Sequence, residues 1–239
     1  MRKFLKFILI LILIIAFALV CCSIYGYFYY QELTKRTPLK DKIDEIKSEY
    51  TYVKIGEVPE DYKNAVVAVE DRRYYSHGPV DYIGLARALV INIKSQELQQ
   101  GGSTITQQVA KNLYLIEDKD SDNVRKKFCE LFLARELEKE YSKDEILEIY
   151  MNIIYFGNGY YGIKEACNGY LKKNPIDMNL AESTMMAGIP NAPSVYAPTV
   201  NKELCKNRQK KVISSMVDAG YISKEEAENV DSDFIDKIN

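Results

Sequence analysis

The feature that most constrains this 239-residue chain is a long apolar run near its N-terminus. No charged residue occurs from Phe7 through Tyr30. A helix needs about 20 apolar residues to cross a bilayer core, so the run is long enough to do so. A cleaved signal peptide is the alternative, but its apolar part usually has roughly 7–15 residues and ends at a small-residue cleavage site, which this run lacks. The sequence therefore predicts a transmembrane anchor over 7–30, after a short segment 1–6.

The charges around this run favour one orientation. Arg2, Lys3 and Lys6 precede it, and an aromatic cluster ends it, as is common at a membrane–water interface. The positive charge predicts a cytoplasmic N-terminus, with the rest of the chain on the other side of the membrane. Basic and acidic residues mixed together after the run weaken this argument.

Composition limits the kind of domain that follows. Hydrophobic residues make up 47% of the chain, enough for the core of one domain, which we expect over 59–239 after a polar connector over 31–58. The 32 Lys and Arg against 34 Asp and Glu give a net charge of -2 and predict no nucleic-acid partner. The five cysteines form no metal-spaced pair and no disulfide framework.

Local patterns predict a mostly α-helical domain. Apolar residues recur at helical spacing over 80–93 and 124–132, and Leu137 follows as a core residue. Three polar pairs fit the capping box, in which side chains satisfy the open backbone donors of a first helical turn. They are Thr104 with Gln107, Ser142 with Glu145, and Ser223 with Glu226. The connector is expected to contain one short strand, at Tyr52–Ile55.

Glycine and proline mark the expected ends of helices. Gly157 and Gly220 are candidate stops, because glycine adopts the left-handed conformation that often ends a helix. Three prolines in "IPNAPSVYAPT" cannot continue a helix, so this stretch is expected to be a shaped loop.

The stretch "GGSTITQQVAKN", residues 101–112, is unusually rich in small hydrogen-bonding groups. Its glycines allow a tight turn, after which Ser103 or Thr104 opens a helix whose first amides favour an anion. Gln107, Gln108 and Lys111 project further along that helix and could hold phosphate oxygens and sugar hydroxyls. A well-capped helix with a polar exposed face is the alternative. The order of a P-loop is absent, which argues against a nucleotide triphosphatase.

Two acidic residues are candidates for chemistry. Glu70 ends an apolar run, where burial would raise its pKa towards that of a general base, although a salt-bridge cluster at a helix end is the alternative. Lys126 and Lys127 lie one helical turn before Glu130, an arrangement that could hold a diphosphate or be a solvated set of ion pairs. The single histidine, His77, has no partner for a common metal site, so a structural hydrogen bond is favoured over catalysis.

Five stretches, in this order, resemble the motifs of the peptidoglycan glycosyltransferases, glycosyltransferase family 51, and in particular its single-domain, membrane-anchored members. They are "EDRRYYSH", "GGSTITQQVAKN", "KKFCE", "ILEIYMNIIYFGNGYYGIKEACNGYLKK" and "AESTMMAGIPNAPSVYAP". Two departures from the family pattern stand out. Lys126 occupies the position of the family's arginine, and Arg125 lies one position earlier. After its histidine the family has one other residue and then a glycine, whereas here Gly78 follows His77 directly and Pro79 comes next.

The resemblance implies a lysozyme-like helical fold and the joining of disaccharide units into glycan strands. It makes Glu70 the base that removes the proton from the acceptor 4-hydroxyl, and makes Glu130 the group that stabilises the leaving diphosphate with Lys126 and Lys127. An inverting displacement needs a base on the acceptor side and charge relief on the leaving side, which agrees with two separate carboxylates. The substrate-binding residues expected by resemblance are Asp71, Ser103, Thr104, Gln107, Gln108, Lys111, Asn112 and Tyr170.

The resemblance also implies partners and a location. The expected substrates are lipid II and the growing lipid-linked glycan strand, at a bacterial cell membrane that the chain crosses once, with the domain on the extracytoplasmic side. Other cell-wall synthesis proteins are candidate partners. No cofactor is required by the sequence, although a divalent cation, Mg or Mn, near Asp71 or Glu130 is an open alternative.

Two other functions stay open at this point. A lysozyme-like hydrolase would need only one acidic residue of raised pKa. A non-catalytic, membrane-anchored scaffold would need none. No S-x-x-K with a later K-T-G follows the helical domain, so we expect a monofunctional enzyme without a transpeptidase unit.

Overall fold

The computed structural model describes residues 2–95, 102–116, 118 and 121–238, apart from the side chains of 89 and 91–95. The described residues form helices and no strand, and a single bridge joins Tyr155 to Tyr161. The predicted mostly α-helical fold is therefore confirmed.

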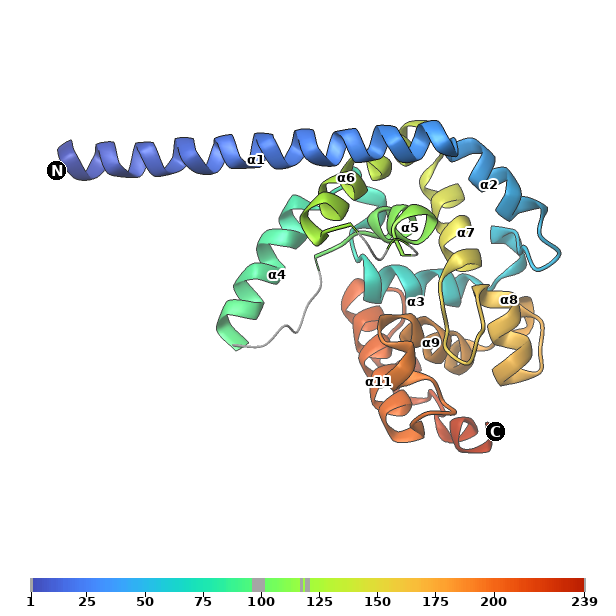
Figure 1. Cartoon of the computed structure of the whole chain (residues 1–239). Coiled ribbons are helices and arrows are strands. Elements are labelled where there is room, and N and C mark those ends of the chain that lie inside the picture. The colour runs from blue at the N-terminus through green and yellow to red at the C-terminus, as the bar shows by residue number, and fades with distance from the viewer. Residues whose placement is uncertain (1, 96–101, 117, 119–120, 239) are drawn as a thin grey trace.

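The first helix, α1 (Arg2–Arg36), is the longest element described and measures about 52 Å at 1.5 Å per residue. Its N-terminal part projects from the body of the molecule (Figure 1), and its apolar side chains there are exposed. By length and composition this helix could cross a membrane. It continues without a break beyond residue 30, so the predicted connector begins inside the helix.

The C-terminal part of α1 packs on α6 (Asn123–Glu140). The two helices touch at Gly26, where an added Cβ would meet the Phe128 Cβ and would lie 2.9 Å from the Cys129 nitrogen. Tyr27 meets the ring of Phe132 edge-on, with 5.3 Å between the ring centroids. Phe128 and Phe132 of the apolar stripe that predicted this helix thus lie against α1, whereas Val124 is exposed, and Leu137 is buried in the core as expected.

The connector contains α2 (Leu39–Ser48) and a 3-10 turn, η1 (Ile55–Glu57). The predicted strand at Tyr52–Ile55 is wrong. The backbone at Val53 pairs with a side chain instead of a second strand, because its N–H donates to Asn152 Oδ1 and its carbonyl accepts from Asn152 Nδ2, both at 2.8 Å.

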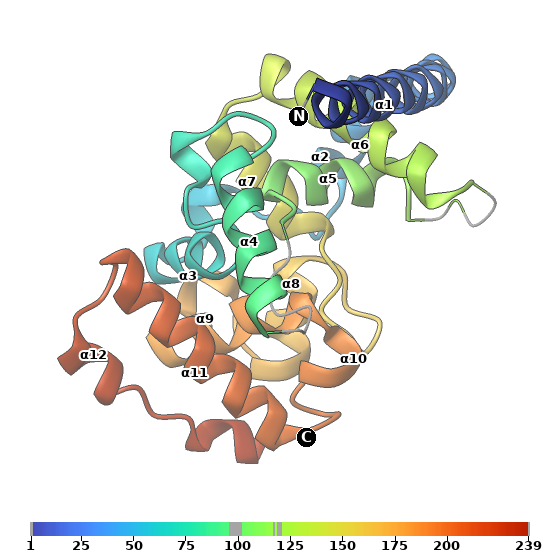
Figure 2. The same ribbon diagram turned by 90° about the vertical axis from the view of Figure 1, so that its left-hand side faces the viewer.

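The body of the domain is built around five helices. They are α3 (Glu60–Glu70), α5 (Ile105–Tyr114), α7 (Lys143–Ile153), α9 (Leu180–Gly188) and α11 (Lys202–Ala219). Helix α3 packs on α9 and α11, whereas α5 packs on α6 and α7. Helix α4 (Tyr82–Ser95) projects on the same side of the body as the free part of α1 (Figures 1 and 2).

Short elements join these helices. They are η2 (Tyr74–Ser76), α8 (Gly162–Ala166), the π-helical η3 (Cys167–Leu171), η4 (Pro175–Asp177), η5 (Ile189–Asn191), α10 (Pro193–Tyr196), α12 (Lys224–Glu228) and η6 (Asp233–Lys237). The proline-rich stretch does end a helix, but it is not a plain loop. Pro190 and Pro193 each lie in the first turn of a short helical element, where a proline's missing N–H costs no hydrogen bond.

The predicted helix boundaries are mostly confirmed. All three capping boxes form, and Gly220 ends α11 with a φ of +79°. The expectation for Gly157 is wrong: α7 already ends at Ile153, and Gly157, with a φ of +86°, lies in the turn that follows.

Candidate active site

The start of α5 lies between the two candidate carboxylates. Gln107 Nε2 donates to Glu130 Oε1 at 3.0 Å, and its neighbour Gln108 donates from Nε2 to Glu70 Oε2 at 2.9 Å. Consecutive residues on one helix face in different directions, so α5 separates the two acidic groups. Glu70 and Glu130 are far apart in the sequence, but each accepts a hydrogen bond from α5. The structure therefore places them on two sides of the same helix.

The capping box fixes the orientation of Gln107. Its Oε1 accepts from the Thr104 backbone N–H at 3.0 Å, while the Thr104 hydroxyl accepts from the Gln107 N–H at 3.1 Å. Because Oε1 is taken by a donor, the Gln107 amide must present its N–H₂ group to Glu130. Thr104 and Gln107 are buried in this network, so their predicted role as substrate contacts stays a prediction.

The first amides of α5 are already occupied. Asp71, which follows the last residue of α3, accepts from the Ile105 N–H through Oδ2 at 3.1 Å, and its Oδ1 lies 2.7 Å from His77 Nε2. A protein carboxylate thus occupies the helix N-terminus where the sequence suggested an external anion. Burial raises the pKa of Asp71, and His77 opposes that shift. His77 holds the turn after α3 to Asp71, in keeping with a structural role.

Glu70 lies in an enclosed setting at the end of α3. Its side chain is 10% exposed, and Arg208 of α11 approaches it with Nη2 at 3.5 Å from Oε1. Burial raises the pKa of Glu70, while the hydrogen bond from Gln108 and the charge of Arg208 oppose the shift. A carboxylate with a raised pKa and few partners is suited to accepting a proton.

Glu130 lies beneath a rim of exposed polar groups. It forms an ion pair with Lys127, whose ammonium also lies 3.2 Å from the Ser103 hydroxyl. Burial raises the pKa of Glu130, and the charges of Lys127 and Lys111 oppose this. Because Ser103, Lys111 and Lys127 are exposed, they are available to an anionic ligand above the buried carboxylate.

The expected pairing of Lys126 with Glu130 is wrong. The Lys126 ammonium donates to the backbone carbonyl of Asp118 instead. Arg125 turns towards α1, where its guanidinium lies 3.1 Å from Glu32 Oε2 and 4.1 Å from the centroid of the Tyr29 ring. Three consecutive basic residues therefore have three different partners, and Lys127 is the one that meets Glu130.

The remaining predicted residues are committed to the protein itself. Asn112 donates to the Gln108 carbonyl at 2.8 Å within α5. Tyr170 is buried and donates from its hydroxyl to the Phe156 carbonyl at 2.9 Å. Neither contact places a free polar group beside a carboxylate, so the predicted substrate-binding roles of Asn112 and Tyr170 stay predictions.

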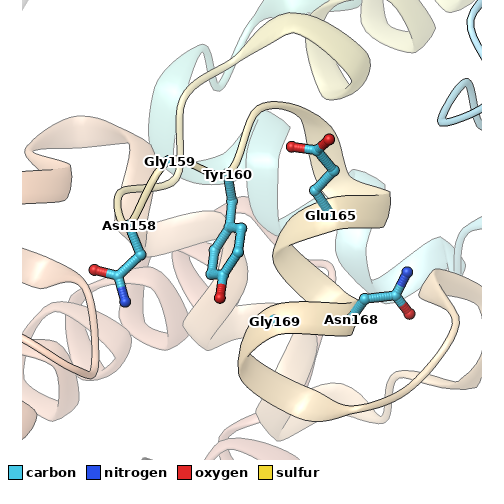
Figure 3. A pocket seen from close by; sticks show the side chains of 6 residues that line it. All are labelled: Asn158, Gly159, Tyr160, Glu165, Asn168 and Gly169. Atoms are coloured by element: carbon cyan, nitrogen blue, oxygen red, sulfur yellow. The ribbon is translucent and has the colours of Figure 1, made fainter.

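A hollow of about 520 Å³ lies beside Tyr160 (Figure 3). Tyr160, one of its lining residues, meets the Tyr170 ring edge-on, with 5.2 Å between the ring centroids. The other lining residues are Asn158, Gly159, Glu165, Asn168 and Gly169. None of the predicted site residues lines this hollow, so it is separate from the carboxylate pair.

One group of side chains has the spacing of a metal site. Ligand atoms of Asp71, His77 and Asp81 lie within 4.8 Å of one another. However, Asp81 is already paired with Arg73, whose Nε lies 3.1 Å from Asp81 Oδ2, and His77 is bound to Asp71. A divalent cation would have to displace this guanidinium, and a histidine is a poor ligand for Mg²⁺. These residues fit an ion-pair network better than a metal site.

Arg208 is the functional candidate that the sequence did not reveal. It occurs in "CKNRQKKV" among other basic residues, with no motif to single it out. No local pattern around Arg208 predicts a contact with Glu70, because the two residues are far apart in the sequence. Only the packing of α11 on α3 shows that contact.

The described residues thus form an all-helical domain that presents two buried carboxylates on either side of α5, together with a helix apolar enough to span a membrane by length and composition. A family model described as Transglycosylase matches residues 39–217. The chain belongs to this family, glycosyltransferase family 51.

Two relatives agree with this assignment by sequence identity. Penicillin-binding protein 1A of Neisseria gonorrhoeae is 48% identical over 172 residues, which are 72% of this chain and 21% of that protein. A Cupriavidus necator protein named as a transglycosylase is 43% identical over 192 residues, 80% of this chain and 81% of that protein. The crystal structure of penicillin-binding protein 1A from Haemophilus influenzae has a TM-score of 0.44 and 24% identity, over 75% of this chain and 17% of that one. This chain thus spans about a fifth of the length of the Neisseria relative.

Proposed function

We propose that this chain is a peptidoglycan glycosyltransferase that polymerises lipid II into glycan strands with inversion at the anomeric carbon. Family membership supports the reaction class. The observation that carries the proposal is the pair of glutamine amides on α5, which hold Glu70 and Glu130 on two sides of one helix. One carboxylate is enclosed, and the other lies under exposed cations, as the two ends of a displacement require.

In the proposed reaction, Glu70 removes the proton from the acceptor 4-hydroxyl. The hydroxyl oxygen forms a bond to the anomeric carbon of the donor as the bond from that carbon to the diphosphate oxygen breaks. The electron pair of the broken bond leaves with the lipid diphosphate, and the proton ends on Glu70. The raised pKa of Glu70 suits this transfer, since a base near the working pH is both ionised and able to hold a proton.

Glu130 acts on the leaving side through Lys127. Its ion pair fixes the ammonium beside Ser103, and Lys111 adds a second positive charge nearby. A diphosphate can leave without a general acid when cations neutralise its charge. We assign Lys127, Lys111 and the Ser103 hydroxyl to the diphosphate, and leave a divalent cation at this position as a further test.

The membrane location follows from the substrate. A polyprenyl tail stays in the bilayer, so an enzyme anchored beside it meets its substrate at a raised effective concentration. Helix α1 would supply the anchor, and α4, with Tyr82, Ile83 and Val90 exposed, projects on the same side (Figure 2). We infer an extracytoplasmic domain at the bacterial cell membrane, where other cell-wall synthesis proteins would be its partners.

The test is incubation of the purified full chain with lipid II in detergent, with a divalent cation in one arm and a chelator in the other. Polymer together with released lipid diphosphate is expected. Activity only on preformed glycan would establish a hydrolase instead, and no conversion of either substrate would favour a scaffold. Equal rates with the divalent cation and with the chelator would show that the reaction needs no metal.

A further inference from the structure

Arg208 is a buried arginine with three partners. Its Nε donates to the Gly188 carbonyl at 3.2 Å, and its Nη2 lies 3.5 Å from Glu70 Oε1. Its guanidinium carbon lies 5.6 Å from the centroid of the Tyr196 ring. A buried guanidinium is costly unless it is paired, so these contacts make Arg208 a fixed part of the domain and not a surface charge.

The groups that face Glu70 come from several helices. Asp71 follows it directly and raises its pKa, whereas Gln108 of α5 and Arg208 of α11 lower it. Tyr62 of α3 and Tyr150 of α7 are buried; burial raises the pKa of both phenols, and the negative charge of Glu70 adds to the shift. Neither phenol has a hydrogen-bond partner among the described residues.

Among the described residues, the charges that act on Glu70 are those of Asp71 and Arg208. Glu182, the titratable residue of α9, is paired with Lys173 at 2.7 Å. Figure 1 shows α9 and α11 side by side next to α3, and Arg208 reaches Glu70 from there. The positive charge in contact with Glu70 therefore comes from Arg208.

We propose that Arg208 is a positioning residue, which keeps the Glu70 carboxylate ionised and aims it at the acceptor hydroxyl. The inference rests on the proposed function of Glu70 as the base. Gln108 holds one carboxylate oxygen and Arg208 the other, so the plane of the group is set by two helices from different parts of the chain. Without Arg208, burial would act on Glu70 with no opposing cation.

The end of α9 and the proline-rich stretch after it supply the contacts that fix Arg208. At Gly188 an added Cβ would lie 3.0 Å from Arg208 Cγ, so a larger residue there would push against the arginine stem. The Gly188 carbonyl and the Tyr196 ring then hold the guanidinium from two sides. Gly188 and Tyr196 belong to the fifth motif. In this proposal the fifth motif therefore helps to keep Glu70 ionised by holding Arg208 in place.

The test is the pH dependence of lipid II turnover by the full chain, with Arg208→Met, Arg208→Lys and Lys210→Met compared with wild type. Lys210→Met is the matched control, because it removes one exposed positive charge from the same helix. An opposite charge at this range moves a pKa by about 1–3 units, so Arg208→Met should move the acid limb of the profile upwards by about that much. Arg208→Lys should restore the acid limb but not the full plateau rate, because lysine has a single nitrogen in place of the Nε and Nη2 that contact Gly188 and Glu70 in a fixed geometry. Lys210→Met should match wild type.

An unmoved acid limb in Arg208→Met, with only a lower melting temperature, would overturn the proposal and leave Arg208 a structural role. If Arg208→Met does not fold, Tyr196→Leu removes only the stacked ring and should move the acid limb in the same direction by a smaller amount. No movement there would count equally against the proposal.

A second readout separates this proposal from the proposed function. Infrared titration of the purified protein reports the Glu70 carboxyl band, assigned by its loss in Glu70→Gln. Its midpoint should rise in Arg208→Met and stay in place in Lys210→Met. If Glu70→Gln kept full turnover while the midpoint still moved, the assigned reaction would be wrong but the coupling of Arg208 to Glu70 would be right.

Discussion

Glu70 and Glu130 differ less in their own burial than in the cations that face them. The two side chains are 10% and 7% exposed, and each accepts one hydrogen bond from a glutamine of α5. The Arg208 side chain beside Glu70 is 8% exposed, whereas the Lys127 side chain beside Glu130 is 49% exposed. The buried Arg208 has its partners within the protein, whereas an exposed cation such as Lys127 can also bind a ligand. The comparison teaches that two glutamates of similar burial differ through their surroundings, which is why we propose proton transfer for Glu70 and place the anion on the cations beside Glu130.

The largest effect should come from Glu70→Gln. If Glu70 is the base, the amide keeps the shape but cannot take a proton, and turnover of lipid II should fall by about 10²–10⁴-fold. Product release measured with labelled lipid II checks this. Glu203→Gln, an exposed change on α11, is the matched control and should leave the rate unaltered. If Glu70→Gln turned over lipid II at the wild-type rate, Glu70 would not be the base.

A smaller effect should separate two neighbouring lysines on the Glu130 side. If Lys127 binds the diphosphate as proposed, Lys127→Met removes a charge-assisted contact worth about 1.5–3 kcal/mol, so turnover should fall by about 10–100-fold. Lys126→Met removes an ammonium that donates to the Asp118 carbonyl and has no contact with Glu130 among the described residues, so its effect should be several times weaker. Equal losses in steady-state rates would mean that the two lysines share the ligand after all.

The stability of the domain should depend on pH through the buried carboxyls. Burial raises the pKa of Glu70 above its ordinary value of 4.5, so the native state holds this proton more tightly than the unfolded chain. The contribution of this proton to stability is full below 4.5 and is lost as pH rises through the native value. Glu70→Gln should therefore gain melting temperature over wild type at pH 8, and the gain should shrink towards pH 4. If the gain in melting temperature instead grew towards low pH, the pKa of Glu70 would be lowered in the native state and not raised.

The smallest effect on chemistry should come from the contact between α1 and α6, which lies on the Glu130 side only. Gly26→Ala places a methyl group against Phe128 and Cys129, and overpacking of this kind costs about 1–3 kcal/mol. The melting temperature in detergent should fall, while the acid limb set by Glu70 should not move. Ala16→Leu, on the free part of α1, is the control and should melt like wild type. A shifted acid limb in Gly26→Ala would show that the two sides are coupled.

Features formed within a few residues could be predicted from the sequence. The capping box of Thr104 and Gln107, the end of α11 at Gly220 and the position of Glu70 at the end of an apolar helix all depend on neighbours in the chain. The error at Tyr52–Ile55 has the opposite cause. An extended segment there meets the side chain of Asn152, a partner from a distant helix that no local pattern predicts.

By itself, the sequence determined the helical elements, the long apolar helix at the N-terminus and the residue types needed for acid–base and phosphate chemistry, because helical spacing, capping and hydrophobicity act between near neighbours. Tertiary structure alone decided the partners. It assigned Lys127 and not Lys126 to Glu130, turned Arg125 to α1, and brought Arg208 from α11 to Glu70. The physical reason is that the charge state of a buried group depends on whatever packs around it, and packing joins residues that the sequence keeps far apart.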